Sequence, residues 1–390
     1  MNESIMENEQ YKTALDLLYL VSCSVNGETP DRARCAEMDF GKVFKMALGH
    51  SLTVVSALAL EQVTPLPENY REEKFKCIRR LSLFEVEWSS ILDLFEQNGI
   101  WYLPLKGIVM KRYYRKSSMR EMGDNDILFD AARADDVKRI MESLGYTCKK
   151  FGRSNHDVYQ KHDELFFEMH KALFSSSSMP QFISFFEDIK SRLLPDGTGQ
   201  FAYRMSHEDF YLFLICHLYK HYSRTGTGLR SLLDVYVFNK YFENKTDADY
   251  LLGALEQLQL SAFERDIRQL AEKVFTNQPL SEDEQNELMF FVTSGCQGTK
   301  DNLMANSLHN DDSRKAKYRY VVNRLKLSDG MIKDRYPKLY RHKIFYPVLA
   351  VYRPVAGVIK KPKVIAGELK RLVQFRKRKT PECIMMNKNE

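Results

Sequence analysis

The sequence predicts an α+β protein in which a small mixed sheet lies between helical segments. From residue 100 to residue 170 the expected order is strand, helix, strand, helix and then antiparallel strands. On both sides of this stretch, apolar residues recur at the spacing of amphipathic helices. A basic segment follows at the far end of the chain. We therefore expect four segments, at residues 1–98, 99–175, 176–300 and 301–390.

Composition excludes several broad classes of protein. A chain of 390 residues, 44% of them apolar, can build a substantial core and is not disordered as a whole. The seven cysteines are scattered without a CxxC pair, which favours a reducing compartment over a disulfide framework. The acidic start MNESIMENEQ does not resemble a signal peptide, and the apolar stretch 344–359 is shorter than the roughly 20 residues of a spanning helix. We expect a cytoplasmic protein, with peripheral contact to a membrane as a further option.

The individual elements follow from local signals. Apolar residues from Leu81 to Phe95 keep helical spacing, and Asn98 with Gly99 is a typical helix end. A second helix is marked by Val137 to Leu144. Short strands are predicted at residues 100–105, 126–129, 146–151, 157–161 and 164–170. Later helices are predicted from Ser206 to His221, from Leu229 to about Tyr241 and over 248–293, followed by a polar linker at 302–312.

Two aspartates open the second predicted strand. Asp124 and Asp126 stand two apart, so in a strand they project from one face while Asn125 points to the other. Two unpaired carboxylates side by side repel each other, and a divalent cation such as Mg²⁺ or Mn²⁺ removes this cost. Glu168, an acid inside an apolar strand, is the candidate for a third ligand. The alternative is an acidic strand end at which Asp126 caps the next helix.

Nearby residues fit phosphate binding. Lys106 and Gly107 lie where a strand turns into a helix, and such a helix start offers free N–H groups to a phosphate. Arg120, just before the acids, can donate two hydrogen bonds to a phosphate. The alternative for each is an ordinary turn or a surface ion pair.

The motifs together resemble a known superfamily. They comprise the segment LPLKGIVMKRYYRKSSMREMGDNDILF, the Leu144–Tyr146 turn and the strand that contains FFEMH. This combination is similar to the nucleotidyltransferase superfamily with a DNA polymerase beta-like palm. More narrowly, it resembles a bacterial branch with Leu-Lys-Gly, Arg, Asp-x-Asp and Glu-Leu-His motifs. The resemblance spans about residues 75–240, with its motifs in 103–170.

The resemblance implies Mg²⁺-dependent transfer of a nucleoside monophosphate from a nucleoside triphosphate to an acceptor. It assigns Asp124, Asp126 and Glu168 to metal binding and catalysis. It assigns nucleotide binding to Lys106, Gly107 and Arg120. A further pattern of His and Arg-x-x-x-Asp in this branch has no assigned role, and we place its residues at the nucleotide site as well: His217, His221, Arg230 and Asp234. Two departures from the superfamily are Ile108 after the glycine and Asn125 between the acids. The acceptor could be a sugar, a small molecule or a protein.

The sequence allows more than one role for each of three histidines. His217 and His221 share one helix face, a spacing that can hold zinc, but no third ligand is evident. Packing, or an approach to the nucleotide cleft, is the preferred interpretation. His170 shares a strand face with Glu168, either as a structural histidine or to orient that acid.

The C-terminal segment is strongly basic. Residues 314–390 hold 22 Lys and Arg and 5 Asp and Glu, a net charge of +17, so residues 1–313 carry 6 − 17 = −11. Basic residues interleaved with aromatics over 314–379 suit an anionic membrane surface or nucleic acid. The alternative is a solvated surface packed on the acidic body. Two rival functions also stay open, a phosphotransferase using the same site and a non-catalytic palm that binds an anionic partner through this segment.

Overall fold

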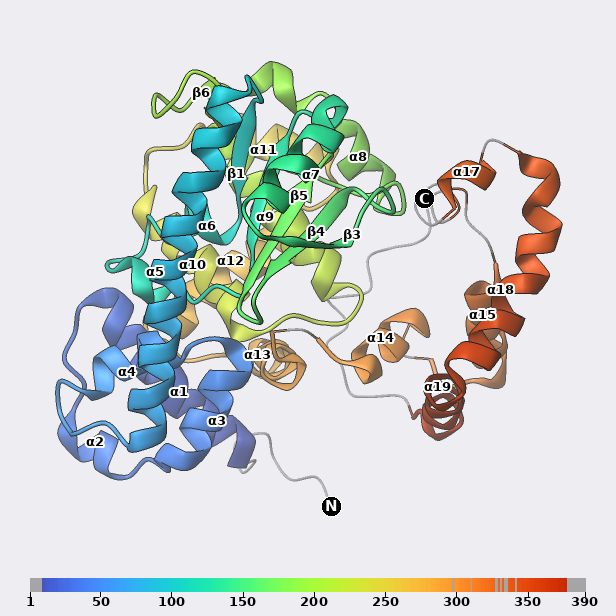
Figure 1. Cartoon of the computed structure of the whole chain (residues 1–390). Helices are drawn as coiled ribbons and strands as arrows, with labels where there is room; N and C mark the ends of the chain where they lie inside the picture. Colours follow the sequence, from blue (N-terminus) through green and yellow to red (C-terminus); the bar gives the residue numbers. More distant parts are fainter. Residues whose placement is uncertain are drawn as a thin grey trace.

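The computed structural model contains a five-stranded mixed sheet in its middle (Figure 1). It describes residues 9–296, 298–309, 311–326, 329, 332, 336–340 and 342–376. The strand order is β1-β2-β5-β4-β3, with β2 and β5 parallel and the other neighbours antiparallel. The strands are β1 (Tyr102–Leu105), β2 (Asn125–Phe129), β3 (Thr147–Lys150), β4 (His156–Lys161) and β5 (Leu165–His170). The predicted α+β class and mixed sheet are confirmed.

Two helices cover one face of this sheet. They are α5 (Glu68–Gln97) and α7 (Ala134–Ser143), which pack against alternate side chains of β2 and β5 in one apolar core. Phe84 of α5 lies against Phe167 of β5, with ring centroids 5.8 Å apart. The helix α5 ends at Gln97, and Gly99 adopts a φ of +63°, as the predicted helix end requires. Because side chains alternate along a strand, Asp126 and Glu168 point to the opposite face.

The opposite face looks toward a larger helical body. Its first part is α1 (Glu9–Asn26), α2 (Arg32–Ala36), α3 (Phe40–His50) and α4 (Thr53–Leu60). Its second part is α8 (Pro180–Phe186), α9 (His207–Tyr222), α10 (Leu229–Tyr241), α11 (Ala248–Gln257), α12 (Ser261–Phe275) and α13 (Glu282–Ser294). Short elements connect the rest: α6 (Gly107–Met110), η2 (Ser117–Met119), η3 (Ala131–Arg133), η4 (Ile189–Arg192), β6 (Leu194–Pro195) and β7 (Tyr203–Arg204).

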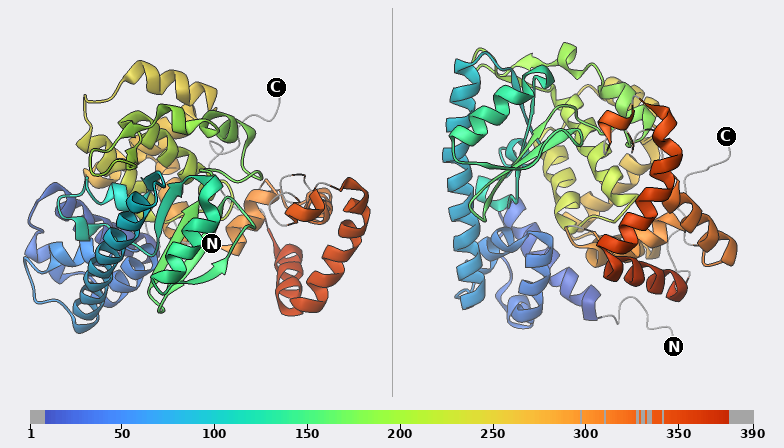
Figure 2. Two further views of the ribbon diagram at one scale, coloured as in Figure 1. Left: turned by 45° about the horizontal axis from the view of Figure 1, so that its top comes forward. Right: turned by 45° about the vertical axis from the view of Figure 1, so that its right-hand side comes forward.

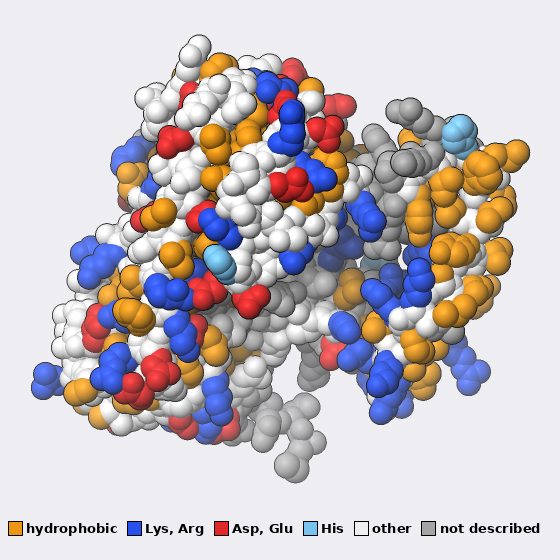
Figure 3. Space-filling model, in the orientation of Figure 1, with side chains coloured by type: hydrophobic (Ala, Val, Ile, Leu, Met, Phe, Trp, Pro, Cys, Tyr) orange, Lys and Arg blue, Asp and Glu red, His pale blue; other side chains and the backbone are white. Residues whose placement is uncertain are grey.

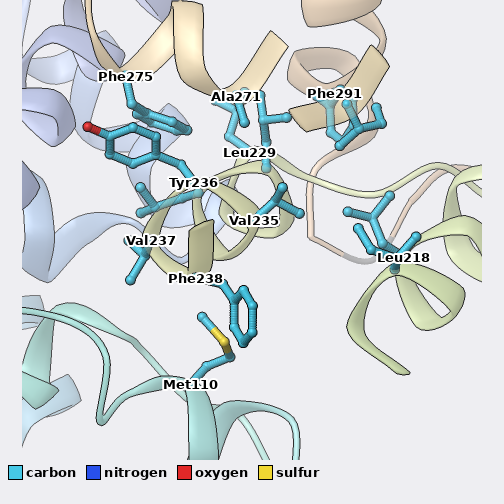
Figure 4. Close-up of a cluster of buried hydrophobic side chains, with 14 of the residues drawn as sticks. Met110, Leu218, Leu229, Val235, Tyr236, Val237, Phe238, Ala271, Phe275 and Phe291 are labelled. Atoms are coloured by element: carbon cyan, nitrogen blue, oxygen red, sulfur yellow. The ribbon is translucent and has the colours of Figure 1, made fainter. Parts of the chain in front are cut away.

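Segments far apart in sequence share the core of this body. Side chains of α9, α10, α12 and α13 meet in it, together with Met110 beside the sheet (Figure 4). Asn26 of α1 joins the same region, since it donates to the carbonyl of Phe275 at 2.8 Å and accepts from Tyr236 at 2.7 Å. The predicted segments 1–98 and 176–300 therefore pack together as neighbours.

The basic segment forms its own helices. They are α14 (Lys300–Ser307), α15 (Arg314–Leu325), α17 (Pro337–Tyr340), η5 (Lys343–Phe345), α18 (Tyr346–Lys360) and α19 (Pro362–Gln374). In Figures 1 and 2, α15, α18 and α19 stand out from one side of the molecule. Among the described residues, no helix has the length and apolarity needed to cross a membrane.

The polar linker predicted at 302–312 is wrong for its first half. Helix α14 runs through Ser307, because Thr299 caps it by accepting from the backbone N–H of Asn302 at 3.0 Å. Met304 and Leu308 are buried against α15 and α19, so apolar packing stabilises a segment whose composition is mostly polar.

Candidate active site

Asp126 and Glu168 lie side by side across the parallel strands β2 and β5. They are register partners, so both carboxylates emerge on the face that looks toward the helical body. Asp126 is buried, whereas Glu168 is partly exposed. The alternative in which Asp126 caps the following helix is not realised, because Asp126 lies within β2 and Asp130 caps the next turn.

Asp124 lies just before the strand. Strand β2 begins at Asn125, so Asp124 is not a strand residue, as it would have to be to project from the same strand face as Asp126. Asp124 is exposed at the mouth of the site. Desolvation by the surrounding protein, with the negative charges of Asp126 and Glu168, raises the pKa of Asp124 to about 6, although the positive charge of Lys106 opposes this. The three acids therefore form one electrostatically coupled group.

Asn125 points to the other side of the sheet, as predicted. Its side chain is fully buried, and neither its amide nitrogen nor its amide oxygen has a hydrogen-bond partner within the described parts of the chain. A polar group buried in this way costs stability. This agrees with the departure from the usual apolar residue at that position, although nothing in the structure explains the choice of asparagine.

Lys106 adopts a backbone conformation that favours glycine. Its φ is +51° and its ψ is −121°, and it immediately precedes Gly107, the first residue of α6. Its Nζ lies 2.6 Å from Oδ1 of Asp126. Burial alone would lower the pKa of Lys106, but the Asp126 carboxylate outweighs burial and raises it. The strained turn thus holds an ammonium group directly against a predicted metal ligand.

Two histidines flank the acids. Nε2 of His170 lies 2.8 Å from Oδ1 of Asp126 and 3.5 Å from Oε2 of Glu168. Nε2 of His156, on β4 opposite His170, lies 3.6 Å from Oε1 of Glu168. Burial lowers the pKa of His156 to about 4. Although burial opposes them, Lys106 and His170 hold the pKa of Asp126 well below its usual range.

His156 was missed in the sequence. Together, His156, Glu168 and His170 offer three potential ligand atoms within 4.8 Å of one another. The signal that could have found it is the predicted hairpin, since a tight turn near residue 163 places His156 opposite His170.

Arg120 is engaged by Asp234 of α10. Its Nε donates to Oδ1 of Asp234 at 2.7 Å, its Nη2 donates to Oδ2 at 2.8 Å, and its Nη1 donates to the carbonyl of Glu121. Tyr114 donates to the same Asp234 at 2.7 Å. All three nitrogens of the guanidinium are therefore satisfied by protein, although the side chain borders the site.

His217 and His221 lie on one face of α9, with their Nε2 atoms 3.1 Å apart. Burial, helped by neighbouring lysines, lowers the pKa of His221 to about 4 and that of His217 well below its usual value. No described acid or cysteine joins them in a candidate metal cluster. Both rings are thus neutral side chains beside the acids.

A cavity of about 630 Å³ joins these residues. The site residues predicted from the sequence all line it, though they come from β2, β5, α6, α9, α10 and the loops between. They are Lys106, Gly107, Arg120, Asp124, Asp126, Glu168, His170, His217, His221, Arg230 and Asp234. Lys220 also lines it and was missed, although it lies between the two histidines of α9. Such a cavity, acidic on its floor and basic on its walls, suits a ligand with phosphates and a metal ion.

The fold and the site together define a class of protein. In this class a small mixed sheet carries acidic side chains on one face, and helices cover that face. The comparison with protein families gives the same class: a model described as an uncharacterised nucleotidyltransferase matches residues 44–276, more than half of the chain. The chain belongs to this family, which supports a general role in nucleotidyl transfer. Neither the curated proteins nor the solved structures yielded a significant match.

Proposed function

We propose that the protein transfers a nucleoside monophosphate from a nucleoside triphosphate to an acceptor hydroxyl or phosphate, with Mg²⁺ or Mn²⁺ as cofactor and pyrophosphate as the second product. The observation that carries this proposal is the register pairing of Asp126 with Glu168 on the floor of the cavity. Adjacent carboxylates on neighbouring strands repel each other, and the single positive charge of Lys106 does not balance the three acids of the group.

The donor set fits a hard divalent cation. Asp124, Asp126 and Glu168 would hold it, because Mg²⁺ prefers carboxylate oxygens and keeps sites for substrate phosphates. Lys106 and His170 both contact Oδ1 of Asp126, and neither contact uses Oδ2. Desolvation, together with the same crowding of negative charge, raises the pKa of Asp124. A bound cation would neutralise charge that develops on the phosphates.

The basic wall supplies groups for the triphosphate. Lys220 and Arg230 line the cavity from α9 and α10, opposite the acids. Among the described residues the Arg230 guanidinium makes one long hydrogen bond, from Nη1 to the carbonyl of Glu121 at 3.4 Å, and the side chain is half-buried, so it keeps donors for an anion. Gly107 lets a phosphate approach the turn at the start of α6. Since Arg120 is satisfied by Asp234 and Glu121, we assign phosphate contact to Arg230 ahead of Arg120.

Glu168 is better placed than Asp126 to take the acceptor's proton. It is partly exposed to the cavity, while Asp126 is buried beneath it. His156 and His170 lie 3.6 Å and 3.5 Å from its two oxygens and orient the carboxylate. Proton transfer needs the base within hydrogen-bond reach of the acceptor, a condition that an open-facing carboxylate can meet.

Calorimetric titration of ATP and GTP into the protein, with and without Mg²⁺, tests the site. We expect Mg²⁺-dependent binding that is lost in Asp126→Asn and Glu168→Gln but kept in Asp93→Asn, which removes an exposed carboxylate of α5 remote from the cavity. Absence of binding by folded wild-type protein would overturn the proposal. Transfer of label from the α-phosphate identifies nucleotidyl transfer, whereas transfer from the γ-phosphate would identify a phosphotransferase.

A further inference from the structure

The outer face of α18 is apolar, the reverse of an ordinary surface helix. Six large apolar side chains on α18 and the turn before it are more than half exposed: Ile344, Val348, Val351, Tyr352, Val355 and Ile359. Their spacing of three to four residues places them on one helical stripe. Figure 3 shows hydrophobic side chains gathered over the lobe that carries α18 in Figure 1.

The opposite side of α18 packs against the protein, so the stripe is the side of the helix that faces solvent. Leu349 is buried, and Arg353 donates to the backbone carbonyls of Arg324 and Lys326 at 3.0 Å and 3.2 Å. Arg353 is the only charged residue between Ile344 and Ile359. Between its two ends the helix therefore turns its charged residue, Arg353, toward the protein and its aliphatic side chains toward solvent, which marks an interaction site.

Positive charge borders the stripe. Lys360, Lys361 and Lys363 are exposed where α18 meets α19, and Lys370 and Arg371 are exposed further along α19. In Figure 3, Lys and Arg side chains cluster beside the hydrophobic ones. A stripe of aliphatic side chains bordered by lysines is the pattern of a helix that lies in the interface of an anionic bilayer.

We propose that the α18 stripe, with the bordering lysines, docks the protein on an anionic membrane surface. Helix α18 has 15 residues and is about 22 Å long, too short to span a hydrocarbon core of about 30 Å, so it would lie in the plane of the interface. The lysine ammonium groups would reach the lipid phosphates while Val351 and Ile359 enter the acyl boundary.

Two other occupants fit the observations less well. Nucleic acid is bound through phosphate contacts and aromatic stacking, and it gives no reason to expose a face built mainly of valine and isoleucine. A second copy of the chain docked through the same stripe would offer the bordering lysines no acidic partner there, because residues 344–367 contain no Asp or Glu. An anionic lipid surface offers acyl chains to the aliphatic stripe and phosphates to the lysines beside it. The inference does not depend on the proposed nucleotidyl transfer.

Co-sedimentation of the full chain with vesicles tests the proposal. We expect binding to phosphatidylglycerol-containing vesicles and little binding to phosphatidylcholine alone. The double variant Val351→Asp/Ile359→Asp should abolish binding, and both sites are exposed, so folding should be retained. Lys360→Gln/Lys361→Gln/Lys363→Gln should weaken binding about fivefold per lysine. The matched control is Val86→Asp, which places the same charge at an exposed valine of α5.

Three outcomes would overturn it. The first is absence of binding by the wild type to anionic vesicles. The second is equal binding by wild type and the double aspartate variant. The third is a different partner for protein that does not bind vesicles. This partner would be a second copy, seen as a dimer in light scattering that depends on Val351 and Ile359, or a single-stranded RNA oligomer whose capture depends on the lysines. Vesicle binding also leaves the calorimetric test of the nucleotide site unaffected, so the two proposals can fail separately.

Discussion

Arg120 and Asp234 form a buried two-point ion pair that joins the loop before β2 to helix α10. The two residues are 114 positions apart in the sequence. Tyr114 donates to the same carboxylate, so Asp234 gathers three charge-assisted hydrogen bonds in the interior. The pair sets where the acidic floor of the cavity lies relative to its basic wall.

Removing one partner of this pair should be costly. Asp234→Asn leaves the Arg120 guanidinium buried without a compensating charge, and we expect it to lower the free energy of unfolding by about 3 kcal/mol. Urea denaturation followed by circular dichroism measures the change. The control is Glu68→Gln, which breaks an exposed pair with Arg71 and should cost less than about 0.5 kcal/mol. Equal effects in the two variants would show that burial of the Arg120 pair contributes nothing.

The strained backbone of Lys106 gives a second prediction. Lys106→Ala and Lys106→Gly both remove the ammonium group from Asp126, but only glycine adopts a φ of +51° without strain. The glycine variant should therefore be more stable than the alanine variant by about 1 kcal/mol. Thermal and urea unfolding compare the two. If alanine proves the more stable, the positive φ at this position is not a feature of the folded state.

Local signals predicted most of the fold, and the reason is visible in particular elements. The helix through Phe84 and Phe95, the turn at Gly99 and the strand after Asp124 each depend on spacing within a few residues. The pairing of Asp126 with Glu168 could be predicted from the sequence, because the order of strands and helices indicates which strands become neighbours.

The features that escaped prediction depend on contacts between distant segments. Asp234 was placed at the site only through the family resemblance, and nothing in the sequence identifies Arg120 as its partner. Helix α14 was missed because its buried residues meet α15 and α19, which follow later in the chain. His156 needed the exact hairpin register before it could be placed beside Glu168.

His50 should make the fold sensitive to acid. Its ring is buried between α10 and α13, where Nδ1 accepts from the backbone N–H of Leu229 and Nε2 donates to the carbonyl of Val292, both at 3.1 Å. Burial lowers the pKa of His50 to about 4, although the Val292 contact opposes this. The folded state therefore binds the proton less readily than the unfolded chain, whose pKa is near 6.5. Stability from this group is complete above pH 6.5 and falls as the pH drops toward 4.

The loss should reach about 3 kcal/mol across that window. Urea denaturation at a series of pH values measures it for the wild type and for His50→Gln, which starts less stable but cannot titrate. We expect the difference between the two to shrink as the pH falls. His162→Asn serves as the control, because His162 is exposed in a turn with a φ of +54° that asparagine tolerates. Parallel pH curves for wild type and His50→Gln would contradict the assignment.

The histidine pair beside Glu168 should decide which metal the site prefers. Imidazole nitrogen binds Mn²⁺ better than it binds Mg²⁺, which favours oxygen ligands alone. With His156 and His170 near the oxygens of Glu168, we expect the wild type to bind Mn²⁺ about tenfold more tightly than Mg²⁺. His156→Phe keeps a ring of similar size and removes one of the two imidazole ligands, so it should weaken this preference while leaving Mg²⁺ binding within about twofold. Calorimetry with each metal, and the electron paramagnetic resonance signal of free Mn²⁺, measure both affinities, and His162→Asn should behave as wild type. An unchanged preference for Mn²⁺ in His156→Phe would show that His156 does not contact the metal.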